Sequence, residues 1–205
     1  MQYRISFGKR GGLNLGPIGF LLAINFLLWV ATSIKPVILI SLFGLSRMTF
    51  PEHWWAIVTS MFIHEPFPGF WHILANMFTL YFFGSYLNRL VGERNFLIVY
   101  FIGGIVGSVA FLLLSNPFSI GIGASGAVFA VAGALTVLRP KLRVFIMPIP
   151  IPIPLWVAVL GGFVLLSLPM FSGGVAWQAH LGGLAFGLIM GYFYRRRQRR
   201  ILFEL

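Results

Sequence analysis

The sequence predicts an all-α polytopic membrane protein, built as a bundle of six transmembrane helices. The first observation is composition: 59% of its 205 residues are hydrophobic and only 9% are charged. A soluble domain carries roughly 25% charged residues, so this chain has too little charge to cover a water-facing surface. The second is that the apolar residues form six long segments with basic residues between them. At this length we expect one compact membrane domain.

Each segment approaches the length of about 20 largely apolar residues that a bilayer requires. We predict the spans at Leu15–Ile34, His72–Val91, Phe96–Ser115, Gly123–Leu138, Pro154–Phe171 and Val175–Tyr194. The fourth segment is short and rich in Gly and Ala, so we expect it to be buried among its neighbours. No cleavage pattern follows the first segment, and it is long enough to span. We interpret it as a retained signal-anchor.

The positions of Lys and Arg predict the orientation, because cytoplasmic loops carry an excess of both. Six spans place both termini on one side. That side collects Arg4, Lys9, Arg10, Arg89, Arg94, Arg139, Lys141, Arg143, Arg195, Arg196, Arg197, Arg199 and Arg200. The opposite side receives only Lys35 and Arg47. We therefore predict a multi-pass protein of the cell membrane with both termini cytoplasmic. A formal charge of +11 arranged in this way suits membrane lipids with anionic headgroups, and no nucleic-acid partner is expected.

The predicted spans also define the segments that lie outside the membrane. Residues 1–14 are predicted to be a cytoplasmic N-terminal segment, residues 15–194 the membrane domain and residues 195–205 a basic cytoplasmic tail. The longest connection, about 35–71 on the outer side, is apolar, and loops of this length are unusual without a function. We expect a partly buried, interfacial element with short helices. The run from Pro148 to Pro154 alternates Pro with Ile, which predicts an extended connector at the cytoplasmic interface.

Polar side chains within the predicted spans are functional candidates, because they are costly in a bilayer. His72 and Asn76 occupy the first turns of the second span, one helical turn apart on one face. Ser125 opens the fourth span, and His180 lies in the second turn of the sixth. All three spans enter from the outer side. The topology therefore predicts these four side chains at a similar depth, below the outer surface.

Small residues spaced by four predict that the fourth and sixth spans pack closely. The two rows are Gly126, Ala130 and Ala134, and Ala179, Gly183, Gly187 and Gly191. If these rows face each other, Ser125 meets His180. A serine oxygen within hydrogen-bond reach of an imidazole is an activated nucleophile. The start of a helix also offers free N–H groups to a developing oxyanion.

Each of these features also has a purely structural interpretation. A serine at a helix start is usually a cap, and a row of small residues is usually helix packing alone. His180 by itself fits a buried, hydrogen-bonded side chain, and His72 and Asn76 satisfy each other in such a reading. Phe129 by itself is a core residue. The convergence at one depth, rather than any single residue, favours catalysis.

Other protease chemistries are excluded by composition. The chain has no cysteine and no aspartate, so thiolate catalysis and an aspartyl dyad are impossible. The zinc motif requires a second His after His64-Glu65, where Pro66, Phe67 and Pro68 follow instead. No glutamate has an obvious route to His180, so a serine–histidine dyad remains and no cofactor or metal is expected. For His64, and for His53 in the same loop, we expect a solvated or structural role.

These residues resemble the rhomboid family of intramembrane serine proteases. The matching motifs are His72-Ile-Leu-Ala-Asn76, Gly123-Ala-Ser-Gly126 and Ala179-His-Leu-Gly-Gly183 with Gly187, in this order across the six-span core. The resemblance implies a rhomboid-like bundle that cleaves single-span or other transmembrane substrates near the outer face. It implies Ser125 as nucleophile, His180 as base, and His72 and Asn76 as oxyanion donors beside the Ser125 N–H.

The resemblance implies further roles for several residues. Phe129 stacks against the base, and supporting positions are Gly123, Gly126, Gly183 and Gly187. The outer loop is half-submerged, and the fifth span is a mobile gate. The family often has Trp-Arg in this loop, where this chain has Trp54-Trp55. With no seventh span or accessory domain in the sequence, the chain resembles the minimal six-span form common in prokaryotes.

Two alternatives remain open. One is a catalytically inactive rhomboid-like binder or chaperone of membrane proteins, although such proteins typically lack the Ser or the His. The other is a small channel or transporter. That function requires polar groups reaching the inner leaflet, whereas the fourth and sixth spans are small or apolar below the candidate site.

Overall fold

The computed structural model describes residues 16–146, 151–168 and 176–203. Helices coincide with the predicted spans, and their ends differ by a few residues except at the carboxyl end of the last helix, which runs well beyond Tyr194. Five of them are α1 (Gly16–Ile34), α6 (Glu93–Leu114), α7 (Ser125–Leu138), α8 (Leu155–Ser167) and α9 (Trp177–Phe203). Residues 169–171 and 175, in the predicted fifth and sixth spans, lie outside the described residues, as does the predicted N-terminal segment 1–14.

The predicted second span is helical throughout but not uniformly α-helical. It consists of α4 (Phe70–Thr79), a π-helical turn η2 (Leu80–Gly84) and α5 (Ser85–Val91). Such wider turns often mark functional sites. Gly84 closes this one, where an added Cβ would lie 3.0 Å from Leu80 and 3.1 Å from Ile18 of α1. The absence of a side chain therefore lets α1 approach the wider turn.

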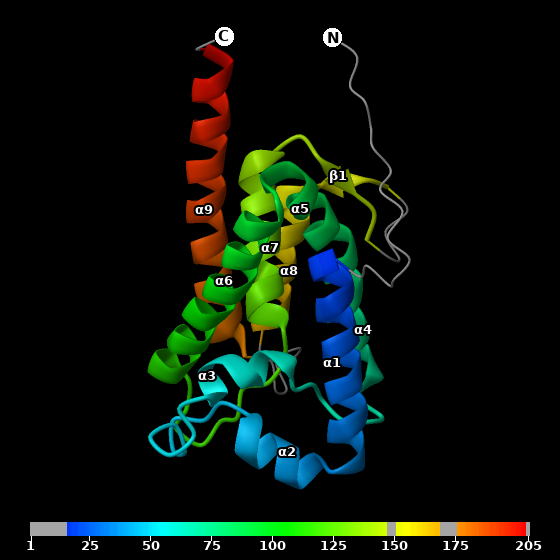
Figure 1. The fold of residues 1–205 in the computed structure, drawn as a ribbon, viewed down its shortest axis with the longest axis vertical. Helices are drawn as coiled ribbons and strands as arrows, with labels where there is room; N and C mark the ends of the chain where they lie inside the picture. Colours follow the sequence, from blue (N-terminus) through cyan, green and yellow to red (C-terminus); the bar gives the residue numbers. More distant parts are fainter. Residues whose placement is uncertain (1–15, 147–150, 169–175, 204–205) are drawn as a thin grey trace.

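Helix α7 forms the centre of the bundle, as its small residues predicted. All of its 14 residues are buried except Ser125, Phe129 and Val137. Figure 1 shows α7 and α8 in the middle, with α9 on one flank and α1 and α4 on the other. Because other helices rather than lipid surround α7, its surface can consist of small residues instead of large apolar side chains.

The two predicted rows of small residues face each other. A Cβ built on Gly183 of α9 would lie 2.0 Å from the carbonyl oxygen of Gly126 in α7, and one on Gly187 would lie 2.0 Å from that of Ala130. One turn further, a Cβ on Gly191 would lie 2.7 Å from the Ala134 oxygen. The backbones of α7 and α9 are therefore in direct contact along three turns, which confirms the prediction from spacing.

The outer connection contains the short helices that its length and apolar character predicted. They are α2 (Pro36–Phe43), α3 (Ala56–Thr59) and the 3₁₀ turn η1 (Ser60–Phe62). Trp55, where the family often has Arg, donates its indole N–H to the Leu42 carbonyl over 2.8 Å and so ties α3 to the end of α2. Helices α2 and α3 lie at the end of the molecule opposite to the carboxyl end of α9 (Figure 1).

At the other end, the structure contains two features that the sequence did not predict. Strands β1 (Arg143–Val144) and β2 (Ile153–Pro154) pair antiparallel. The end of the proline run is extended, as predicted, but it is also paired with β1, while residues 148–150 lie outside the described residues. Helix α9 continues to Phe203, through the arginines assigned to a separate tail.

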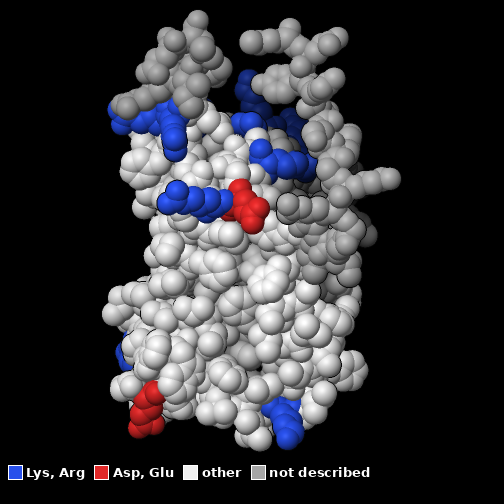
Figure 2. Space-filling model, viewed as in Figure 1, with Lys and Arg blue, Asp and Glu red and all other residues white. Residues whose placement is uncertain are grey.

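Charged side chains are concentrated toward the two ends of the molecule. Figure 2 shows Lys and Arg gathered at the end that holds β1, a broad uncharged belt below them, and few charges at the other end. Among the described residues, α1 and α6 are the two helices that are long and apolar enough on their own to cross a membrane. Helices α7 and α8 are apolar but shorter, with 14 and 13 residues.

Candidate active site

Ser125 and His180 are in hydrogen-bond contact. Ser125 is the first residue of α7, half-buried, and His180 lies in the first turn of α9 with 3% of its surface exposed. The distance between Ser125 Oγ and His180 Nε2 is 2.7 Å. The juxtaposition that the sequence predicted from depth and small-residue spacing is present in the structure.

Glycine contacts bring the two side chains together. A Cβ on Gly107 of α6 would lie 2.6 Å from the Ala179 carbonyl oxygen, and one on Gly126 would lie 3.3 Å from the same oxygen. Helices α6, α7 and α9 therefore meet at Ala179, the residue before His180. A larger side chain at Gly126 would push α7, which carries the serine, away from α9, which carries the imidazole, and one at Gly107 would push α6 away from α9.

The imidazole of His180 is stacked on an aromatic ring. Phe129, one turn after Ser125, lies parallel to it with ring centroids 4.5 Å apart and 28° between the planes. Phe163 of α8 packs edge-on against Phe129 at 6.2 Å. Within residues 16–146, 151–168 and 176–203, no group hydrogen-bonds to Nδ1 of His180. Stacking, rather than a carboxylate, orients this ring in the part of the chain described.

His72 lies on the other side of the serine. Its Nε2 would be 2.6 Å from a Cβ on Gly123, so the imidazole lies directly against the backbone two residues before Ser125. Gly123 has a φ of +113°, a conformation that side chains disfavour. Both the close approach and the backbone angle therefore require glycine at this position.

Asn76 is buried one turn below His72 in α4. Its side-chain amide donates one hydrogen bond to the His72 carbonyl oxygen over 2.9 Å. This contact matches the structural interpretation of the pair, in which the two residues satisfy each other. A primary amide has two N–H donors, so the second N–H of Asn76 is not used by this bond.

His64 lies beside the candidate site, where the sequence did not place it. Of the solvated or structural role predicted for it, only the solvated one is wrong, because its side chain is 0% exposed and its ring lies 5.2 Å from the ring of His72. Its Nε2 accepts a hydrogen bond from the backbone N–H of Ala124 over 3.4 Å. Burial, with a smaller contribution from the nearby His72, lowers the pKa of His64 to about 3. The only signal in the sequence was the apolar run Met61–Ile63 before it.

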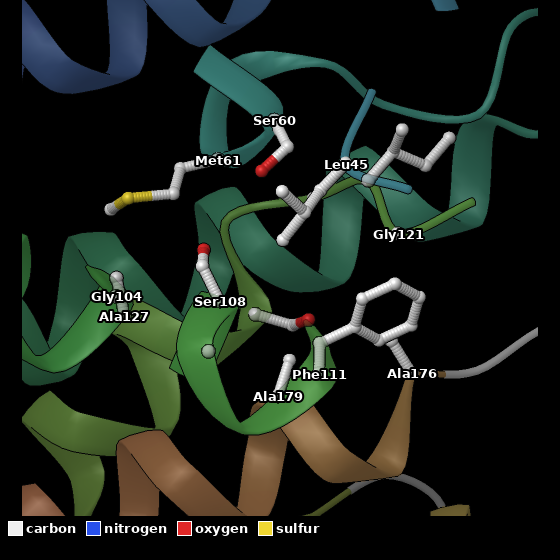
Figure 3. Close-up of a pocket in the computed structure, with 14 residues that line it drawn as sticks. Leu45, Ser60, Met61, Gly104, Ser108, Phe111, Gly121, Ala127, Ala176 and Ala179 are labelled. Atoms are coloured by element: carbon white, nitrogen blue, oxygen red, sulfur yellow. The ribbon is translucent and has the colours of Figure 1, made fainter. Parts of the chain in front are cut away.

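A small pocket adjoins Ser125. It has a volume of about 20 Å³ and lies between η1, α6 and the start of α9 (Figure 3). Ser60 and Ser108 supply hydroxyl groups, while Phe111 and Ala179 supply apolar walls. A polar cavity above roughly 10–15 Å³ holds one water molecule. Among the described residues no cluster of three His or Glu side chains is placed to hold a metal ion.

The fold and the site together define a helical protein with a partly buried serine–histidine pair where three helices meet. The Rhomboid domain matches residues 51–197, well over half of the chain. The chain therefore belongs to the rhomboid family, whose members are helical proteins that pass through the membrane several times.

Three relatives illustrate the similarity. Rhomboid protein 1, mitochondrial, of Saccharomyces cerevisiae is 32% identical over 161 residues, covering 71% of this chain and 45% of that protein. The putative rhomboid protease YdcA of Bacillus subtilis is 26% identical over 190 residues, covering 89% of this chain and 90% of its own. The rhomboid protease GlpG of Haemophilus influenzae is 29% identical over 133 residues, 64% of this chain and 66% of its own. The chain thus spans less than half of the yeast protein and most of YdcA.

Proposed function

We propose that this chain is an intramembrane serine endopeptidase that cleaves transmembrane segments of other membrane proteins. The observation that carries the proposal is the 2.7 Å contact between Ser125 Oγ and His180 Nε2 in a member of the rhomboid family. Membership of the family, with relatives named as rhomboid proteases, supports intramembrane proteolysis. The contact supports a serine mechanism run by a dyad.

In the first half of the reaction, His180 Nε2 accepts the proton of Ser125 as Oγ attacks the carbonyl carbon of the substrate peptide bond. The tetrahedral intermediate then collapses, and the imidazolium returns the proton to the leaving amine. This step leaves an ester between Ser125 and the substrate. The stack with Phe129 keeps the imidazole in one plane through both proton transfers.

The negative oxygen of the intermediate needs several donors aimed at one point. The N–H of Ser125 is one, because the first N–H groups of a helix have no partner within it. His72 and the second N–H of Asn76 are the other two. The position of His72 beside Gly123 supports its role, and the N–H that the bond to the His72 carbonyl leaves unused supports that of Asn76.

In the second half, water attacks the ester with His180 as base. The pocket beside Ser125 has space for about one water molecule and two serine hydroxyls to hold it. A nucleophilic water therefore has a place beside the serine.

The proposal places the protein in a cell membrane with six spans, formed by α1, the α4–α5 rod, α6, α7, α8 and α9, and with both termini cytoplasmic. The gathering of Lys and Arg at one end of the molecule supports the orientation (Figure 2). Helix α7 is about 21 Å long at 1.5 Å per residue. This is shorter than the hydrocarbon core of about 30 Å, but α7 is buried by its neighbours. The extensive alignment with a Bacillus subtilis protein supports a prokaryotic plasma membrane.

This orientation predicts where substrates are cut. The serine and the imidazole lie toward the end of the bundle that carries α3, so scission falls near the outer end of a substrate span. Gly or Pro near the cut favours cleavage, because the substrate helix must unwind locally. Mass spectrometry of the fragments measures this, and a cut at the cytoplasmic end contradicts the orientation.

The experiment that tests the proposed function uses purified protein in liposomes with a single-span reporter substrate. Ser125→Ala and His180→Ala each abolish cleavage, and the double variant is no worse, because members of a catalytic unit are not additive. A chelator leaves turnover unchanged. Cleavage that survives Ser125→Ala, or that a chelator removes, rules out the serine mechanism. Binding without cleavage by the intact chain instead supports the inactive-relative alternative.

A further inference from the structure

The segment that ends in His64 holds the backbone in front of the serine. Gly123 N–H donates to the Ser60 carbonyl oxygen over 2.9 Å, and Ala124 N–H donates to His64 Nε2 over 3.4 Å. Two successive amides before Ser125 are thus bonded to the same short piece of the outer connection. The acceptor for Gly123 is a backbone carbonyl oxygen, whereas the acceptor for Ala124 is the His64 side chain. Only the second acceptor can be removed by substitution.

The chemistry of His64 suits an acceptor. The Ala124 N–H requires a lone pair on Nε2, which only the neutral ring with its proton on Nδ1 provides. Burial keeps the ring neutral, since it lowers the pKa of His64 to about 3 and the neighbouring His72 acts in the same direction. A proton relay through His64 would need a charged intermediate that this environment disfavours.

The ring of His64 also contacts His72. Their centroids are 5.2 Å apart and the planes are inclined by 62°, an edge-to-face arrangement. His72 in turn lies against Gly123. One buried imidazole therefore contacts both parts of the site on the oxyanion side: the peptide that leads into Ser125 and the histidine proposed as a donor.

We propose that His64 is a positioning residue, whose imidazole fixes the Ala124 peptide and the ring of His72 so that the Ser125 N–H and His72 point at one oxyanion. The inference rests on the proposed function. It assigns His64 no contact with the substrate and no proton transfer. Its effect is geometric, and misplacement of reacting groups by about 1 Å costs roughly 100-fold in rate.

Two substitutions of His64 distinguish the effect of its hydrogen-bond acceptor from the effect of the space that its ring fills. His64→Leu fills much of the same space but cannot accept a hydrogen bond. His64→Gln retains a side-chain acceptor of similar reach. His53→Leu is the matched control, because His53 belongs to the same outer connection and its ring packs at a tilt against Trp55 rather than against a residue of the site.

The test measures kcat and KM on a single-span reporter, the melting temperature, and the rate at which a fluorophosphonate labels Ser125. In His64→Leu we expect kcat and labelling to fall by about 10- to 100-fold with KM near the wild-type value. His64→Gln regains most of this loss at a similar melting temperature, and His53→Leu behaves as wild type. Labelling reports on the serine and its oxyanion donors without any peptide substrate, so it decides the role of His64 even if the reporter is not cleaved.

The outcomes are separable. Wild-type kcat and labelling in folded His64→Leu overturn the inference. Equal losses in His64→Leu and His64→Gln that follow a fall in melting temperature also overturn it, because they indicate a structural role alone. If His64→Leu does not fold, His64→Gln serves as the test. Labelling of Ser125 at a near-wild-type rate in this variant supports the inference, and a loss of about 100-fold in that rate overturns it. Failure of the proposed function has a different signature, namely reporter cleavage that is absent from the wild type or indifferent to Ser125→Ala.

Discussion

The close contact between Gly183 and the Gly126 carbonyl predicts that a larger residue at position 183 moves α9 away from α7 and so separates His180 from Ser125, the proposed catalytic pair. A Cβ at position 183 would lie 2.0 Å from that oxygen, and real Cβ atoms essentially never come closer than 3.0 Å to such a neighbour. In Gly183→Ala, α9 must therefore move away from α7 by about 1.0 to 1.4 Å. The obstacle is backbone, so no side-chain rotation relieves it.

The same displacement acts on the site, because His180 lies one turn before Gly183 and Ser125 lies beside Gly126. Carried through the helix, it stretches the Oγ–Nε2 distance from 2.7 Å to roughly 3.7–4.1 Å, beyond the range of a hydrogen bond. We expect kcat to fall by about 100-fold or more, together with a lower melting temperature. KM changes little, because the substitution lies between two helices rather than on the substrate path.

The assay compares reporter cleavage and fluorophosphonate labelling below the melting temperature of each variant. Gly161→Ala is the matched control, since Gly161 lies in a helix on an exposed face and its added Cβ meets nothing within 4 Å. That variant keeps wild-type turnover and gains slightly in stability from the better helix propensity of Ala. Wild-type turnover in folded Gly183→Ala would refute the view that close helix contact sets the Ser–His distance.

Further substitutions test the oxyanion side. Gly123→Ala places a methyl group 2.6 Å from His72 Nε2 at a backbone φ of +113°, so we expect turnover to fall by roughly 100-fold. Gly92→Ala has the same type of backbone strain at φ +83° with open space around it; it should lose stability alone, and an equal loss of turnover there would contradict the explanation. Asn76→Ala removes one donor of several and should lower kcat by about 10²–10³ with little change in melting temperature. His72→Ala should do likewise, measured on the same preparations; unchanged turnover in both variants ends the oxyanion assignment.

The parts of the structure that the sequence predicted depend on periodic patterns. Small residues four apart marked the contact of α7 with α9, and that contact brought Ser125 to His180. Apolar length and the intervening basic residues located the helices. These patterns involve residues close together in the sequence, so they can be recognised without knowledge of the tertiary structure.

The parts that were missed depend on contacts between distant residues in irregular segments. His64 and Ala124 are 60 positions apart and are joined by a single hydrogen bond from a loop. No periodic pattern in the sequence predicts such a pair. A histidine in an outer loop is also more often solvated than buried. The β1–β2 pairing was missed for a related reason, because alternate prolines remove backbone donors and disfavour strands. Here the pairing is only two residues long and ends at Pro154.

The site therefore combines two kinds of support. The proposed nucleophile and base lie on helices whose backbones touch, where the geometry is set by glycine and changes only if whole helices separate. The oxyanion side is held by hydrogen bonds and ring contacts between the outer connection, α4 and the residues before α7. Loops open at lower free energy than packed helices. A substrate that displaces part of the outer connection would thus disturb the oxyanion donors before it disturbs the dyad. If His64 has the positioning role proposed for it, its bond to the Ala124 N–H then determines whether a bound segment is also cleaved.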